Sequence, residues 1–219
     1  MSASIGPADD TVSSESRAGG SPLPRSLGQS PQSLNSEPPC AFSLHPFAQT
    51  SAGPGLRLEG CVALHGRRLH ITYQLCGDLP SVVLPPPTTE PPERADGLWQ
   101  HTCFELFLAA EGKRPYWEVN LSPDGSWNLY RLDDYRQGLT PVPDRDVLPF
   151  TVISRADRLE LSLDLLLPRE LALACLQRAL QLGVTAVIEH QGGTLTYWAL
   201  AHSGPEADFH RREDFLLRP

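Results

Sequence analysis

Apolar and polar residues alternate most regularly between positions 98 and 135. Three runs in this stretch repeat with a period of two, which is typical of β-strands: 99–108, 115–122 and 126–133. Short tracts of turn residues separate the runs, and the second tract, Pro123-Asp124-Gly125, supplies both a preset φ and a residue that tolerates positive φ. The pattern therefore predicts a three-stranded antiparallel meander.

Successive side chains of a strand point to opposite faces, so each run has an apolar face and a mixed face. The apolar faces of the first two runs are predicted to lie in the core and carry Phe104, Leu106, Leu108, Trp117, Val119 and Leu121. The mixed face carries Trp99 and Glu105 from the first run and Glu118 and Asn120 from the second. An aromatic ring can cover the C–H surface of a polyhydroxylated ligand, while carboxylates and a carboxamide bond its hydroxyl groups. These four residues are therefore candidate ligand-binding residues.

Each candidate also has a purely structural interpretation, which the sequence leaves open. Trp99 could be a core residue beneath the preceding loop, and Glu105 could be held by a cross-strand contact with Arg131. Two acids on one face can raise the pKa of one of them, which would suit acid–base catalysis. No nucleophile or metal site accompanies them in the sequence, so the pattern favours ligand binding over a glycosidase.

The rest of the chain after position 55 contains further short strands. Hairpins are predicted at 56–65 with 68–76, at 150–155 with 158–167, and at 185–190 with 194–201. Other segments are predicted to be irregular: a transition into the domain at 41–53, proline-bearing loops at 78–97 and 136–149, and an extended tail at 203–219. Segment 168–182 fits either a helix or a strand. About eight strands with little helix predict an all-β fold, an antiparallel β-sandwich of the immunoglobulin-like or jelly-roll type.

Composition divides the chain into two parts. Residues 1–39 are rich in Ser, Pro and Gly and poor in large apolar residues, so we expect a disordered tail ahead of one domain at 40–219. The net charge of -8 argues against nucleic acid or anionic membranes as partners. No apolar run approaches the roughly 20 residues of a membrane span. The absence of a secretory signal pattern and the five scattered cysteines lead us to expect free thiols and a cytoplasmic protein.

Three segments carry a family resemblance. They are Trp99 with Glu105 inside HTCFELFLA, then YWEVNLSPDGSWNLYRLDDYR, and finally AVIEHQGGTLTYWALAHSGPEADFH. Together they resemble the bacterial DOMON-like domains, which are related in fold to the family-nine carbohydrate-binding modules and to the haem- or sugar-binding DOMON domains. The resemblance implies an immunoglobulin-like or jelly-roll sandwich with a ligand pocket on one sheet, but it names no ligand.

The resemblance also implies roles for individual residues. In the sugar-binding relatives, two tryptophans clamp a sugar ring, and a Glu with the spacing of Trp99 and Glu105 hydrogen-bonds it. Trp198 falls where the second clamp residue is expected. Haem-binding relatives use a Met/His axial pair, and the only methionine here is Met1.

Taken together, the sequence predicts a non-enzymatic binding domain for a small polar ligand, in the first place a carbohydrate or glycoconjugate. We expect no cofactor and no metal, and the predicted ligand-binding residues are Trp99, Glu105, Glu118, Asn120 and Trp198. Two alternatives stay open: a haem-binding or redox DOMON domain that uses no methionine ligand, and a structural or protein-interaction module without a small ligand. The oligomeric state does not follow from the sequence.

Overall fold

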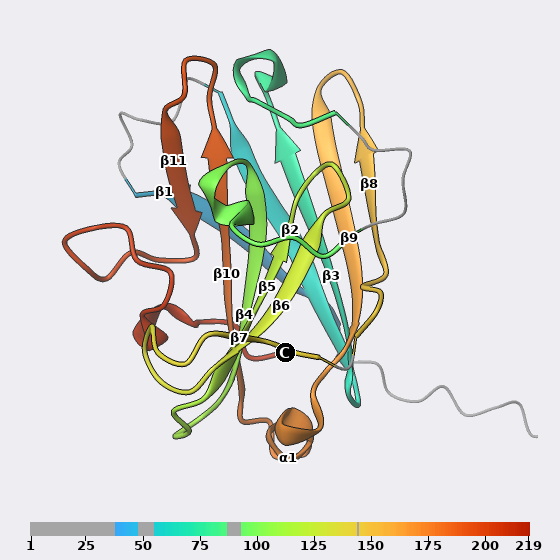
Figure 1. The fold of residues 1–219 in the computed structure, drawn as a ribbon, viewed down its shortest axis with the longest axis vertical. Coiled ribbons are helices and arrows are strands. Elements are labelled where there is room, and N and C mark those ends of the chain that lie inside the picture. The colour runs from blue at the N-terminus through green and yellow to red at the C-terminus, as the bar shows by residue number, and fades with distance from the viewer. Residues whose placement is uncertain (1–37, 48–54, 87–92, 144) are drawn as a thin grey trace, which may run out of the picture. The chain divides into compact units, whose positions relative to one another are not determined.

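The computed structural model describes residues 38–47, 55–86, 93–143 and 145–219 (Figure 1). Within these ranges, eleven strands form one antiparallel sheet in the order β7-β6-β5-β4-β10-β11-β1-β2-β3-β9-β8. The strands are β1 (Cys40–Pro46), β2 (Arg57–His65), β3 (Arg68–Cys76), β4 (Cys103–Ala110), β5 (Tyr116–Leu121), β6 (Trp127–Leu132), β7 (Thr140–Pro141), β8 (Phe150–Ser154), β9 (Arg158–Leu166), β10 (Leu180–Glu189) and β11 (Leu195–Ala199). The helical segments are η1 (Leu79–Ser81), η2 (Leu98–Gln100), η3 (Arg169–Leu171), α1 (Ala172–Leu176) and η4 (Arg212–Asp214).

The sheet curls so that its two halves face each other across the core. β1 takes part in both halves, because residues 40–44 pair with β2 while His45 and Pro46 pair with β11. Across the core, Tyr73 of β3 packs edge-on against Phe104 of β4 with ring centroids 5.3 Å apart. The Tyr73 hydroxyl donates a hydrogen bond of 2.8 Å to the backbone carbonyl of Glu105. Strands β3 and β4 are therefore neighbours through the core, although they are far apart in the sheet order.

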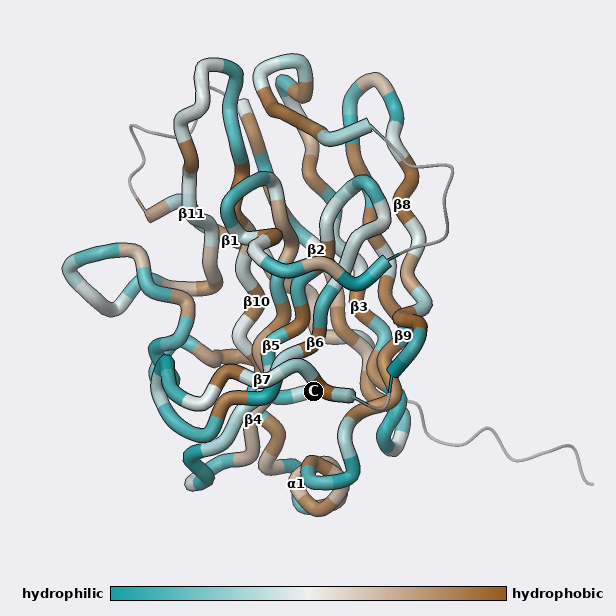
Figure 2. The backbone as a smooth tube through the Cα atoms, viewed as in Figure 1, coloured by the Kyte–Doolittle hydropathy of each residue, from teal (hydrophilic) through white to brown (hydrophobic). Residues whose placement is uncertain are grey.

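The core is built from the apolar faces that alternation predicts. Figure 2 shows short hydrophobic and hydrophilic segments alternating along strands such as β9, where Leu159, Leu161, Leu163 and Leu165 are buried. The six predicted core residues of the meander all belong to the main hydrophobic cluster: Phe104, Leu106, Leu108, Trp117, Val119 and Leu121. Burying one such side chain contributes about 1.5–3 kcal/mol before chain entropy is counted, so this face contributes to the stability of the fold.

The predicted all-β antiparallel architecture is confirmed. The predicted meander corresponds to β4–β6, and the three predicted hairpins correspond to β2–β3, β8–β9 and β10–β11. The topology is one continuous curled sheet, and the finer expectation of a two-sheet sandwich stays a prediction. The predicted disordered tail, 1–39, lies outside the described residues except for 38 and 39.

Several predicted boundaries were wrong. The stretch 41–53 was expected to be a transition, but β1 begins at Cys40, with Phe42 and Leu44 buried on its inner side. Segment 168–182 is divided among η3, α1 and the start of β10, which begins five residues before the predicted strand. The first strand of the meander begins at Cys103 and not at 99, and loop 136–149 contains the short strand β7. These errors concern short strands and strand ends, where pairing with a neighbouring strand and not local alternation decides the assignment.

The C-terminal segment covers the outer face of the sheet beside β4 and β5. Phe215 packs on Phe107 and Tyr116, with ring centroids 5.5 and 6.2 Å away. Leu217 pairs by backbone hydrogen bonds with Leu182 of β10. Gly183 of β10 allows this close packing, because a Cβ there would stand 2.7 Å from the Phe215 ring. The C-terminal segment therefore covers part of the mixed face of the meander, which the sequence did not predict.

Candidate functional site

A pocket of about 330 Å³ lies on the outer face of β4, β5, β10 and β11. It combines two acidic side chains with aromatic, aliphatic and basic ones. Its lining residues are Trp99, Glu105, Glu118, Leu132, Arg136, Leu139, Val187, Tyr197, Ala207, Phe209 and His210. A volume of this size lies at the lower end of the range of small-molecule sites.

The strand register places the two acids diagonally on neighbouring strands. Glu105 of β4 is opposite Asn120 of β5, and Glu118 is opposite Phe107. Diagonal neighbours in an antiparallel pair stand roughly 7–8 Å apart. Only 2% of Glu105 and 5% of Glu118 is exposed, so the pocket brings together two carboxyl groups that are shielded from bulk water.

Hydrogen bonding satisfies Glu118 better than Glu105. The Asn120 amide Nδ2 donates to Glu118 Oε1 over 2.8 Å. Glu105 Oε2 accepts a long hydrogen bond of 3.4 Å from Thr185 Oγ1. Glu105 Oε1 is buried and has no hydrogen-bond partner among the described residues. A buried polar atom without a partner costs about 1–3 kcal/mol, and a ligand hydroxyl at this position would remove that cost.

Burial controls the protonation of this pair. Desolvation raises the pKa of Glu105 well above its usual range, and the neighbouring Glu118 raises it further. Burial also raises the pKa of Glu118, but the hydrogen bond from Asn120 and the positive charge of Arg136 oppose that rise. Glu105 is therefore the more readily protonated of the two acids, and its protonated carboxyl can donate as well as accept a hydrogen bond.

A turn anchored on β6 brings Trp99 to the pocket. Gly97 has φ 74° and precedes η2, which contains Trp99. Before this turn, Asp96 Oδ1 accepts hydrogen bonds from Asn128 Nδ2 over 2.9 Å and from the Tyr130 hydroxyl. The Trp99 ring then packs edge-on against Tyr130 with centroids 6.1 Å apart. Trp99 remains 37% exposed, so part of its ring is available to a ligand.

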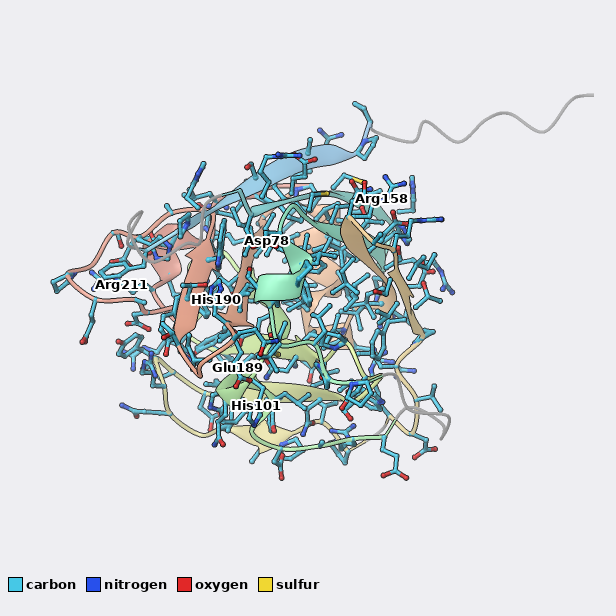
Figure 3. All side chains as sticks on the ribbon, turned by 90° about the horizontal axis from the view of Figure 1, so that it is seen from above. Asp78, His101, Arg158, Glu189, His190 and Arg211 are labelled. Carbon is cyan, nitrogen blue, oxygen red and sulfur yellow. The ribbon has the colours of Figure 1, made fainter. Side chains whose placement is uncertain are left out.

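The far side of the same turn is tied to β10. His101 Nδ1 lies 2.8 Å from Glu189 Oε2, and the two side chains stand next to each other in Figure 3. Because His101 directly follows η2, Trp99 is fixed on both sides, by Asp96 and by His101. This double anchorage limits the conformational entropy that Trp99 would lose on binding a ligand.

The opposite wall comes from the loop after β6 and from the C-terminal segment. Arg136 has an unusual φ of 53° and donates to Asp208 Oδ1 from Nη2 over 2.7 Å. Tyr116 and His210 share a hydrogen bond of 2.7 Å between the phenol oxygen and Nδ1. Burial and the nearby Arg136 lower the pKa of His210 to about 4, so His210 is neutral at neutral pH. Arg136 is therefore the cationic side chain of the pocket, and it is already paired with a carboxylate.

Three of the five predicted binding residues line this pocket, namely Trp99, Glu105 and Glu118. Asn120 is buried behind it and acts on Glu118. Trp198 is placed in the core instead, 2% exposed, where its Nε1 donates to Thr196 Oγ1 over 3.0 Å. Alternation along β11 explains this: Trp198 faces inward, so its neighbour Tyr197 faces the pocket.

Sequence reasoning missed eight further pocket residues, and the polar or aromatic ones among them are Arg136, Tyr197, Phe209 and His210. Tyr197 could have been found from the parity of β11 once Thr196 and Trp198 were assigned to the core. Phe209 and His210 stood out as large side chains in a polar tail, but no local pattern connects that tail with β4 and β5. Their position depends on the packing of Phe215 beside Gly183.

In the described part of the chain, no group of three or more His, Cys, Asp or Glu side chains is close enough together to hold a metal ion. The five cysteines are free. Helices in the described ranges are all too short or too polar to cross a membrane.

Comparison with known proteins gives a likeness of fold. No protein-family model matches the chain, and no curated protein matches it. A "putative carbohydrate-binding protein" from Bacteroides uniformis superposes with a TM-score of 0.56 and 11% identity over 80% of this chain and 84% of that chain. A family-nine carbohydrate-binding module from Caldicellulosiruptor kristjanssonii in complex with glucose gives a TM-score of 0.40 and 13% identity over 70% of this chain and 72% of that chain. The same module in complex with cellotriose gives a TM-score of 0.40 and 11% identity over 70% of each chain. The likeness to the Bacteroides uniformis protein shows a shared fold. The TM-scores of 0.40 are too low to show one.

Proposed function

We propose that this protein binds a small carbohydrate or glycoconjugate in the pocket beside β4 and β5, without catalysing a reaction on it. The pocket offers what a sugar requires. Trp99, Tyr197 and Phe209 provide aromatic surface for C–H groups, and Glu105 and Glu118 provide polar atoms for hydroxyl groups. Asn120 supports the site from behind by holding Glu118.

One observation carries the proposal: the buried Oε1 of Glu105 has no partner among the described residues, yet Glu105 lines the pocket. Native proteins rarely leave a buried polar atom unpaired without a reason. A sugar hydroxyl can both donate to and accept from a carboxyl group. A bound polyol would therefore complete the hydrogen bonding that the protein leaves unfinished.

The fold comparison supports the same class of ligand. The Bacteroides uniformis protein that shares the fold bears the description "putative carbohydrate-binding protein". As part of the proposal, we assign the chain to the DOMON-like group, with the two facing halves of its curled sheet as the layers of a sandwich, and we place it in the cytoplasm. The sequence resemblance and the scattered free cysteines support these assignments.

A glycan array followed by calorimetric titration of the best binder tests the proposal. Trp99→Ala should weaken binding by on the order of 1–3 kcal/mol through lost apolar contact, with little change in melting temperature. Phe47→Ala is the matched control, because Phe47 is 38% exposed, as Trp99 is at 37%, but does not line the pocket. The glycan should be recovered unchanged after incubation.

Three results would contradict the proposal. The array could show no binder, the two alanine variants could weaken binding equally, or the glycan could be cleaved. The last outcome would favour a glycosidase that uses Glu105 and Glu118 as its paired carboxyl groups.

A further inference from the structure

A second pocket, of about 690 Å³, lies at another place in the fold and shares no lining residue with the first. It forms where the β2–β3 turn, the end of β9 and η3 approach β5, β6 and β7. Its lining residues are Arg67, Trp117, Arg131, Thr140, Pro141, Val142, Pro143, Arg145, Leu167, Pro168, Arg169 and Glu170. Four arginines and one glutamate line this cavity, in a chain whose net charge is -8.

Three of these arginines, Arg67, Arg145 and Arg169, have no carboxylate partner within the described ranges. Arg67 Nη2 donates to the Leu167 carbonyl over 2.6 Å, and Arg145 donates to the Leu166 carbonyl. Backbone carbonyls fix the direction of a guanidinium group but do not neutralise its charge. Within the described residues, Arg67 and Arg145 are therefore held in place without a paired carboxylate.

The positive charges are crowded as well as uncompensated. Burial and the neighbouring Arg67 together lower the pKa of Arg145, which indicates that the two guanidinium groups repel each other. Arg67 Nε is buried and has no hydrogen-bond partner among the described residues. Arg131 differs, because it pairs with Asp133 and lies over the Trp117 ring at 5.9 Å. A bound anion would relieve the repulsion and supply the missing acceptor.

The walls between the arginines are apolar. Trp117, Pro141, Val142, Pro143 and Pro168 supply this surface, and the volume is larger than an inorganic anion requires. Guanidinium groups from three separate segments can each meet a different oxygen of a tetrahedral dianion, whereas a carboxylate offers only two oxygens. We propose that this cavity binds a small organic phosphate, with Arg67, Arg145 and Arg169 on the phosphate group and the apolar walls on the remainder of the molecule.

Calorimetric titration of the full chain with phenyl phosphate, at constant ionic strength, tests the inference. Benzoate is the comparison ligand, since it keeps the ring but replaces the phosphate with a carboxylate. Arg169→Gln should weaken phenyl phosphate binding about tenfold or more, as expected for loss of a charge-assisted hydrogen bond. Arg169 is exposed, so the variant should fold normally.

Two further variants make the test selective. Glu170→Gln should tighten binding by a few-fold, because it removes the acidic side chain that lines the cavity. Arg158→Gln is the matched control, because Arg158 is an exposed arginine at the opposite end of β9 from Leu166. The inference is overturned if phenyl phosphate does not bind, if benzoate binds equally well, or if Arg158→Gln weakens binding as much as Arg169→Gln.

Discussion

Glu105 and Glu118 lie diagonally across the β4–β5 pair, and both of these buried side chains line one pocket. The pair is asymmetric. Asn120 donates to Glu118, whereas one oxygen of Glu105 has no partner among the described residues. The asymmetry makes Glu105 the member that keeps a proton and the member with bonding capacity left for a ligand.

Replacing Glu105 with Gln should change how stability depends on pH. The pKa of Glu105 is raised in the folded state, so the folded protein holds a proton that the unfolded chain releases above about pH 4.3. The contribution of Glu105 to the free energy of unfolding therefore falls as the pH rises from about 4.3 toward the raised pKa of the folded state. Glu105→Gln cannot ionise, so its stability relative to wild type should increase across that window.

Urea unfolding between about pH 4 and 8 measures this difference. Glu111→Gln is the control, because Glu111 is exposed in the turn after β4. Its profile should run parallel to that of the wild type. Parallel profiles for Glu105→Gln as well would show that Glu105 ionises normally in the folded protein.

His210 should titrate at an unusually low pH. Burial and Arg136 lower the pKa of His210 to about 4, although Asp208 opposes the shift. Histidine resonances in an NMR titration should show one ring that stays neutral down to about that pH. Arg136→Gln should raise this pKa, since it removes the positive charge and leaves the negative charge of Asp208 without its ion-pair partner. A His210 pKa near the ordinary value of about 6.5 would place the C-terminal segment away from Arg136 and Tyr116.

Gly183→Ala should loosen the C-terminal segment. The added Cβ would stand 2.7 Å from one carbon of the Phe215 ring and 3.3 Å from the Phe107 Cβ, so the ring must move. We expect a loss of about 1–3 kcal/mol from overpacking, together with faster tryptic cleavage at Arg211 and Arg212. Gly66→Ala is the control, because a Cβ there meets open space and adds only the cost of its φ of 61°. Unchanged cleavage in Gly183→Ala would contradict the packing described for Phe215.

Trp198→Phe should affect stability and not ligand binding. The substitution removes the indole N–H that donates to Thr196 and leaves a space in the core, at a cost of about 1–3 kcal/mol. Chemical denaturation measures the loss, and glycan titration should give the affinity of the wild type. Trp99→Ala should give the reverse pattern. A Trp198→Phe variant with normal stability and weak binding would restore the clamp role that the family resemblance implies.

The sequence by itself determined the strands and their faces. Period-two alternation located the meander and three hairpins, and it separated Phe104, Leu106 and Leu108 from Glu105 correctly, because a strand has no other way to bury one face. It also brought Glu105, Glu118 and Asn120 to a common face. These assignments depend only on parity within a strand and on short connections between strands.

Only the tertiary structure decided what covers that face. An extended strand from 99 to 105 would separate Trp99 from Glu105 by roughly 20 Å, but the η2 turn, fixed by Asp96 and His101, lets both side chains line one pocket. Phe209 and His210 reach the same pocket because Phe215 packs beside Gly183. Contacts of this kind join residues about a hundred positions apart, such as Tyr116 and His210. A local sequence pattern cannot predict these contacts, because their stabilising free energy comes from packing between two segments and not from the conformation of either segment.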